Sequence, residues 1–200
     1  MMTSNRLKVT LSQCDHKDIQ GLIELSESVG WDYDEQEIRT LMSSGEIFGH
    51  KNGEGKIVSS AAIIPYENSF ASLGMVIVNK EYRGLGLGRV ATQHCLDSLS
   101  SDISIMLIST EDGKPLYEKM GFKTVDRVHK YICDTYSTSN LTNNTMTIER
   151  FKDSDLHKMI KLDEAAFGDK RSRFLKHRIN QSEQCVVVKD TKGNMIIHPL

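Results

Sequence analysis

Alternating apolar and polar residues open the chain, and the period then changes to that of a helix. Residues 6–12 alternate in the manner of a half-buried strand. Asp15 and Asp18 precede an apolar stripe at helical spacing, which predicts a capped helix that ends near Gly30. A second, shorter helix is expected between Asp34 and Gly45. The stripes consist of Ile19, Leu22, Ile23 and Leu25 in the first helix and of Ile38, Leu41 and Met42 in the second.

The next residues predict antiparallel strands. Residues 47–50 and 57–58 flank a polar turn that contains Asn52-Gly53, a dipeptide typical of hairpins. Strand character continues through residues 61–66 and 70–78. This part of the chain is therefore expected to form a meander.

Helices and strands alternate after this meander. Three closely spaced glycines lead into a helical stripe, and residues 103–108 predict a strand. Residues 114–120 predict a short helix that ends at Gly121, and residues 123–133 a further strand. The helical stripe consists of Leu87, Val90, Ala91, His94, Cys95 and Leu99. The resulting order, β-α-α-β-β-β-α-β-α-β, predicts an α/β fold with a mixed, mainly antiparallel central sheet and flanking helices.

Residues 135–145 are uncharged and dominated by Ser, Thr and Asn, which indicates a linker. Beyond it the pattern predicts strands at residues 147–151 and 186–189, helices at 154–166 and 173–179, and a turn at 192–194 into 195–197. This plan repeats the opening of the chain and then stops. We therefore expect a first domain at residues 1–134, a linker at 135–145 and a partial second domain of similar plan at 146–200.

Composition and charge narrow the function classes. The 200 residues carry 25 basic and 27 acidic side chains, a formal net charge of −2, so a nucleic-acid partner is not expected. No apolar run approaches the length of a membrane span, and no secretory signal is recognisable. Cys14, Cys95, Cys133 and Cys185 lie far apart, and the seven His include no metal-binding pair. These features favour a cytoplasmic protein without metal or membrane contact, in which any anionic ligand is bound by a local feature.

The glycine-rich run provides such a feature. An apolar strand with Val76, Ile77 and Val78 runs into a turn that opens a helix. Glycines allow a ligand to approach the backbone, and free N–H groups at a helix start bind phosphate. The turn comprises Arg83, Gly84, Leu85, Gly86, Leu87, Gly88 and Arg89. Residues 86–91 also fit the dinucleotide-binding pattern G-x-G-x-x-A. A dinucleotide-binding fold, however, needs an opening βαβ unit and an acidic residue at the end of the next strand. Here the motif follows a meander, and Asp102 precedes the next strand.

Two motifs together resemble those of the GCN5-related N-acetyltransferases, the GNAT family. The segment 83–88 resembles the family pattern Arg/Gln-x-x-Gly-x-Gly/Ala, and Leu116-Tyr117 followed by Gly121-Phe122 resembles its L-Y-x-x-x-G-F element. The resemblance covers residues 6–133. The remainder is similar to tandem members with a divergent second acetyltransferase-like domain, most visibly at residues 163–171.

The resemblance implies acetyl-CoA as the acetyl donor and co-substrate. Residues 76–78 would pair with its pantetheine arm, and the N–H groups of residues 84–89 would hold its pyrophosphate. Tyr117 matches the family tyrosine that protonates the leaving thiolate; otherwise it is a packed aromatic of a short helix. Many members carry Asn seven residues before this tyrosine, where this chain has Thr110.

The acceptor side can be argued from chemistry. An alkyl ammonium group, with a pKa near ~10.4, must lose a proton before it attacks a thioester. The resemblance implies that some GNAT members place the base on the strand at residues 69–78, but here this strand contains no Glu or His. The candidates are Glu67, His50, Glu111 or a chain of water molecules. Trp31 and Tyr33 lie between the first two helices, where the resemblance to the GNAT family implies the wall of the acceptor pocket. They either line this pocket or pack the helix pair. Two further features favour structural roles. His94 is expected in the core, and the basic run 170–173 on a solvated face, with contact to an acidic partner as the alternative.

Two functions stay open at this point. The first is an N-acetyltransferase that acetylates a primary amine of a small metabolite or amino acid by direct attack in a ternary complex. The second is a catalytically idle acyl-CoA sensor or regulatory module. In either case residues 146–200 are expected to cover apolar faces by packing on the first domain or by forming a homodimer.

Overall fold

The computed structural model describes residues 8–129, 131–132 and 146–196, and these form two compact units. The first unit comprises residues 8–107 and 167–181, and the second the described residues within 108–166 and 182–196. The expected linker, residues 135–145, lies outside the described residues. The expected domain boundaries stay a prediction.

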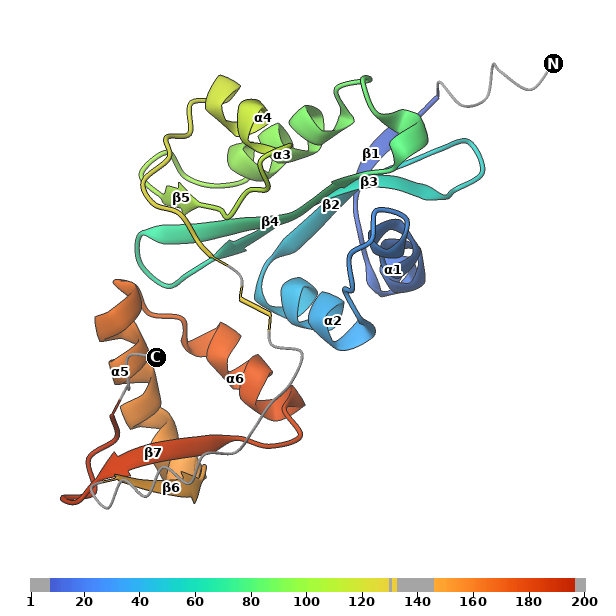
Figure 1. The fold of residues 1–200 in the computed structure, drawn as a ribbon. Coiled ribbons are helices and arrows are strands. Elements are labelled where there is room, and N and C mark those ends of the chain that lie inside the picture. Colours follow the sequence, from blue (N-terminus) through green and yellow to red (C-terminus); the bar gives the residue numbers. More distant parts are fainter. Residues whose placement is uncertain (1–7, 130, 133–145, 197–200) are drawn as a thin grey trace. The chain divides into compact units, whose positions relative to one another are not determined.

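A five-stranded sheet with the order β1-β2-β3-β4-β5 forms the centre of the first unit (Figure 1). Neighbouring strands from β1 to β4 are antiparallel, and β5 is parallel to β4. The mixed, mainly antiparallel sheet predicted from the sequence is therefore confirmed. The strands are β1 (Thr10–Gln13), β2 (Glu46–Lys51), β3 (Ile57–Pro65), β4 (Phe70–Val78) and β5 (Ser104–Met106).

Two helices, α1 (Ile19–Glu27) and α2 (Glu35–Ser44), cover one face of this sheet, and α3 (Leu87–Asp97) covers the other (Figure 1). The Asp34 carboxylate accepts a 2.7 Å hydrogen bond from the Glu37 N–H, and this cap starts α2 as predicted. The core between the helix pair and the sheet is apolar. It contains Ile19, Leu22, Leu25, Ile38, Ile47, Ile57, Ala62, Met75 and Ile77.

Helix α3 contacts the sheet through a narrower face than the sequence predicts. Leu87, Ala91 and Cys95 are buried, at a spacing of four residues. Val90 and His94 belong to the predicted stripe but are exposed, because they lie on the flank of the helix. The prediction of a core His94 is therefore wrong, although its ring packs edge-on against Phe48 at 4.5 Å between centroids.

Two predicted strands differ from the structure. β5 is confined to Ser104–Met106 within the expected 103–108. No strand forms at 123–129 or 131–132 in the described part of the chain, and Val125, Val128 and Tyr131 are exposed. A run of apolar residues forms a strand only where its backbone finds a neighbouring strand, and sequence pattern alone does not supply one.

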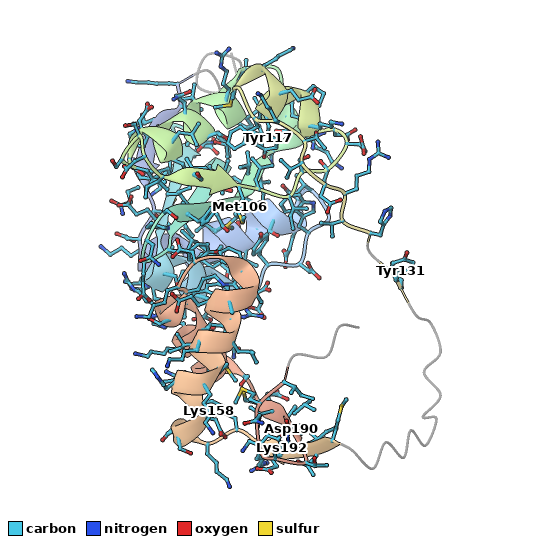
Figure 2. The ribbon with its side chains drawn as sticks, turned by 90° about the vertical axis from the view of Figure 1, so that its left-hand side faces the viewer. Met106, Tyr117, Tyr131, Lys158, Asp190 and Lys192 are labelled. Carbon is cyan, nitrogen blue, oxygen red and sulfur yellow. The ribbon has the colours of Figure 1, made fainter. Side chains whose placement is uncertain are left out.

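The second unit contains α4 (Lys114–Lys119), α5 (Leu156–Phe167, whose last residue belongs to the first unit) and a two-stranded antiparallel sheet. Its strands are β6 (Met146–Arg150) and β7 (Val186–Asp190). After β7 the Asp190 carboxylate accepts hydrogen bonds from the N–H groups of Lys192 and Asn194, which closes the predicted turn (Asp190 and Lys192 in Figure 2). Helix α6 (Ser172–Gln181) belongs to the first unit. The strands, helices and turn expected after the linker are thus present among the described residues.

Candidate functional site

The central feature of the site is a β-bulge in β4. Ser60 on β3 is paired with Ile77, whereas Ala62, two residues on, is paired with Gly74, so β4 carries one extra residue here. The extra residue is Met75. Its φ is 51°, a value that residues other than glycine rarely adopt. Bulges and such backbone conformations are frequent at active sites, because they redirect backbone groups away from the ladder.

Two side chains hold the bulge in place. The Ser60 hydroxyl donates a 2.8 Å hydrogen bond to the Met75 carbonyl. The Tyr33 hydroxyl hydrogen bonds with the Met75 backbone. Burial and then the negative charge of Glu37 raise the pKa of Tyr33, while the bond with Met75 acts in the opposite direction. The phenol is therefore a neutral group at physiological pH, fixed against the bulge.

Beyond the bulge, one edge of β4 pairs with no strand of the described residues. β5 pairs with β4 only from Phe70 to Ser72 and ends at Met106. Residues 76–78 are bonded to β3 on the other side, through the pairs Ser60–Ile77 and Ser59–Val78. An extended ligand can pair with such an edge in the way of an added strand.

The loop that follows β4 is anchored by a buried tyrosine. Tyr82 is buried, and its hydroxyl accepts a 3.2 Å hydrogen bond from the side-chain amide of Asn52. The same Asn52 accepts hydrogen bonds from the N–H groups of Glu54 and Lys56 and so shapes the β2–β3 hairpin turn. Tyr82 thus fixes the start of the glycine-rich loop to the sheet.

The loop itself presents backbone to solvent. Gly84 and Gly86 have φ angles of 80° and 75°, and a Cβ at either would meet no atom within 4 Å. Gly86 precedes α3, no side chain caps this helix, and its first backbone bond runs from Val90 N–H to the Gly86 carbonyl. The N–H groups of the first turn of α3 are therefore available to an anion. Arg83 and Arg89 are exposed on either side of the loop.

Tyr117 belongs to the second unit, on the short helix α4 (Figure 2). Its ring is half-buried and meets Phe122 edge-on, with centroids 5.9 Å apart. Burial raises the pKa of its hydroxyl, which keeps the phenol protonated. Thr110 does not carry the side-chain amide found in many GNAT members; its hydroxyl accepts a 3.1 Å hydrogen bond from the Gly113 N–H, just before α4.

Trp31 and Tyr33 occupy the connection between α1 and α2, with ring centroids 6.1 Å apart. Trp31 is 37% exposed, so it is not a core residue of the helix pair. Tyr33 is half-buried and reaches the bulge as described above. The structure therefore brings one of the two predicted acceptor residues to the centre of the site.

The candidate bases differ in their surroundings. Glu67 accepts a hydrogen bond from the Ser172 N–H and pairs with Lys170 at 3.1 Å, and hydrogen bonding to Ser172 is the main cause that lowers its pKa. His50 is buried, lies 2.6 Å from the Ser59 hydroxyl through Nδ1, and has its pKa lowered by burial. Glu111 is exposed in the second unit. Glu67 and His50 are thus engaged in structural contacts.

Comparison with known protein families agrees with this geometry. Residues 17–131 match the model of an acetyltransferase (GNAT) domain, and residues 159–196 match a second model with the same description. The chain belongs to the GNAT acetyltransferase family. The second match shows that GNAT sequence character extends into the C-terminal part, as the resemblance to tandem members implied.

Among curated proteins, the uncharacterized N-acetyltransferase YitH of Bacillus subtilis is 35% identical over 189 residues. The alignment covers 93% of this chain and 66% of that relative. Two solved structures share the GNAT fold. A Pyrococcus horikoshii protein assigned as an acetyltransferase superposes on 90% of this chain and 64% of its own (TM-score 0.66, 16% identity). Arabidopsis thaliana glucosamine-6-phosphate N-acetyltransferase superposes on 63% of this chain and 99% of its own (TM-score 0.53, 19% identity).

Two further observations concern the part of the GNAT chain that the structure describes. None of its helices has the length and hydropathy that crossing a membrane requires. No three His, Cys, Asp or Glu side chains among these residues come together in a way that could hold a metal ion.

Sequence reasoning did not identify two features of the GNAT site. Neither Met75 at the bulge nor Ser60, which bonds its carbonyl, was singled out. A Ser within an apolar strand is a weak signal, and a bulge becomes visible only when the register of both strands is known.

Proposed function

We propose that this GNAT acetyltransferase moves an acetyl group from acetyl-CoA to the primary amine of a small metabolite or amino acid, by direct attack in a ternary complex. The observation that carries the proposal is the order of three features along β4 and the glycine-rich loop that follows it. The bulge at Met75, the open edge at residues 76–78 and the glycine-rich start of α3 follow one another along the chain, with one 3-10 turn at Lys80–Tyr82 between the last two.

These features fit the two ends of the donor. A pantetheine arm has amide groups that can pair with the open edge at Val76 and Val78. A pyrophosphate carries negative charge that the free N–H groups of residues 84–89, with Arg83 and Arg89, can bind. The surroundings of Gly84 and Gly86 support this fit, since a Cβ at either position would meet no atom of the described residues within 4 Å.

Acetyl-CoA supplies an activated thioester carbonyl when bound. The reaction forms a C–N bond and breaks the C–S bond, so one proton must leave the amine and one must reach the sulfur. Tyr117 is proposed to donate the second proton, and its raised pKa keeps that proton available. Backbone N–H groups of β4 next to the bulge are proposed to polarise the carbonyl.

The surroundings of the bulge support an amine acceptor. Trp31 and Tyr33 offer aromatic faces, which attract cations. Asp32, Glu35 and Glu37 lie on the same connection and the first turn of α2, and they add negative charge. The acceptor therefore arrives as an ammonium ion. Because Glu67 and His50 are engaged in other contacts and Glu111 is exposed in the second unit, we propose that a water chain removes its proton.

Steady-state CoA release with a panel of primary amines tests the proposal. Turnover with at least one amine is expected, and Tyr117→Phe should lower kcat by about 10²-fold or more, the usual contribution of a general acid. Phe122→Leu serves as the control, because it alters the aromatic neighbour without removing a proton donor. Acetyl-CoA binding without turnover on any amine would instead favour the sensor.

A further inference from the structure

Residues 167–181, here called the brace segment, belong to the second acetyltransferase-like part of the sequence but pack on the first sheet. Their main contact is with the turn between β3 and β4. The N–H groups of Asn68, Ser69 and Phe70 donate hydrogen bonds of 3.1, 2.8 and 2.8 Å to the carboxylate of Asp169. The side-chain amide of Asn68 and the N–H of Lys170 donate two more, both of 2.6 Å.

Asp169 is only 1% exposed, so its charge is stabilised by these donors rather than by water. Burial by itself raises the pKa of this carboxyl, but the hydrogen bonds from Ser69, Phe70, Lys170 and Asn68 outweigh it and hold the pKa below its usual range. Asp169 is therefore an ionised group whose place is fixed by the turn that starts β4. In turn, it fixes that backbone at Phe70, the first residue of the strand.

A second carboxylate makes the reciprocal contact. Glu67, in the turn, accepts hydrogen bonds from both the N–H and the hydroxyl of Ser172, the first residue of α6. Its N–H also donates to the Lys170 carbonyl at 3.1 Å. Negative charge at a helix start is favourable because it meets free N–H groups and the helix dipole. Each partner thus satisfies the backbone of the other.

Aromatic packing closes this interface. The Phe167 ring meets Tyr66 edge-on at 5.1 Å and Phe70 at 6.4 Å between centroids. The Arg171 guanidinium lies 3.9 Å from the centroid of Phe167, an arrangement that attracts the cation to the ring. The contact is therefore both polar and apolar, and it orders the start of β4.

The other end of the brace segment reaches the acceptor side. Gln181, the last residue of α6, hydrogen bonds with Thr40 on α2. Helix α2 begins at the Asp34 cap, directly after Tyr33, whose hydroxyl hydrogen bonds with the Met75 backbone at the bulge. One segment thus holds both the strand that carries the bulge and the helix that follows Tyr33.

We propose that Asp169 is a positioning residue for acetyl transfer. It sets the position of β4 relative to the α1–α2 connection and thereby orients the amine acceptor. The proposal rests on the function proposed above. The glycine-rich loop has its own anchor, Tyr82 on Asn52. Residues 76–78, at the other end of β4 from Phe70, are held by their pairing with β3. Because these contacts of the donor side do not involve Asp169, we expect its loss to affect the acceptor side and to leave acetyl-CoA binding unchanged.

The experiment compares Asp169→Asn with the full-length wild-type protein. Trp31 is the one tryptophan of the sequence and lies beside Tyr33, so its fluorescence reports on the α1–α2 connection. We expect a changed emission maximum and stronger acrylamide quenching well below the unfolding temperature. With the best amine of the panel, kcat/KM should fall about 10- to 100-fold, as small misplacements of reacting groups do. The Kd for acetyl-CoA, from calorimetry, should stay within about twofold.

The matched control is Asp190→Asn, the same change at a turn-capping carboxylate of the second unit (Figure 2). This variant should have the Trp31 fluorescence and the kcat/KM of the wild type. If Asp169→Asn does not fold, Glu67→Ala replaces it, since that exposed side chain belongs to the same contact. Unchanged Trp31 fluorescence in the folded variant would overturn the proposal. So would a loss of acetyl-CoA affinity as large as the loss of kcat/KM. A wild-type protein that acetylates no amine defeats the proposed function instead, and the Trp31 comparison then still decides whether Asp169 sets this geometry.

Discussion

The Ser60 hydroxyl donates a 2.8 Å hydrogen bond to the carbonyl of Met75, and both residues are buried. The bond joins β3 to the one residue of β4 whose φ is positive without being glycine in the described chain. The bulge lies between the α1–α2 connection and the open edge of β4. The same bond should therefore contribute both to the stability of the fold and to the geometry of the site.

Ser60→Ala should lower the free energy of unfolding by about 1–3 kcal/mol, since a buried carbonyl loses its donor. Acetyl transfer should fall as well, because the bulge loses one of its two supports. Denaturant unfolding and kcat measure the two effects. Ser104→Ala on the exposed side of β5 is the control and should change neither. A Ser60→Ala variant as stable and active as the wild type would show that the bulge needs no such support.

Gly86→Ala tests the phosphate cradle. The left-handed φ of 75° should cost an alanine about 1 kcal/mol of stability, and its methyl group would occupy space that we assign to the pyrophosphate. The Kd for acetyl-CoA should therefore rise. Gly30→Ala is matched in strain, with a φ of 82° and open space around it, but lies after α1. Calorimetry should show weaker binding for Gly86→Ala alone; equal affinities for the two variants would contradict the assignment.

His50 predicts a pH dependence of stability. Burial lowers its pKa in the folded protein, so the unfolded chain binds a proton more readily. The free energy of unfolding should therefore fall as the pH drops below about 6.5, the ordinary pKa of histidine, and continue to fall down to the folded pKa. Unfolding in urea at pH 7.5, 6 and 5 measures this slope. His50→Gln should flatten it, whereas the exposed His16→Gln should not.

The buried cysteines predict selective thiol reactivity. Burial raises the pKa of the Cys14 and Cys95 thiols to about 12. Because the thiolate is the reactive form, neither should react with a disulfide reagent until the protein unfolds. The number of thiols that react with the reagent is measured in the native and in the denatured protein. The same two measurements are made on a Cys14→Ala/Cys95→Ala variant. Native labelling that falls in the double variant would contradict the prediction.

The local structure of both units follows from particular residues. Asp34 caps α2, Asn52 shapes the hairpin turn and Gly121 ends α4 with a φ of 95°, all as predicted. These outcomes depend on neighbours within a few positions, so sequence spacing is enough to find them. The strand expected at 123–133 depended on a partner strand instead, and its described residues form none.

The site divides in the same way. The glycine-rich run was visible in the sequence because its function depends on residue type at fixed spacing, and Gly84 and Gly86 have the positive φ that only glycine adopts readily. The bulge was not visible, because it is a property of the β3–β4 register. The sequence makes Glu67 one of the candidate bases, but its contacts with Lys170 and Ser172, about a hundred residues later, give it another role.

The sequence by itself determined most of the elements and their order, the GNAT motifs and the loop suited to phosphate, because hydrophobic period, caps and glycines act over short distances. The tertiary structure alone decided that Met75 is the bulge, that Tyr33 reaches it and that Asp169 fixes the start of β4. These relationships join residues far apart in the chain. They form only when strands pair in one register and a buried carboxylate finds backbone donors in place of water.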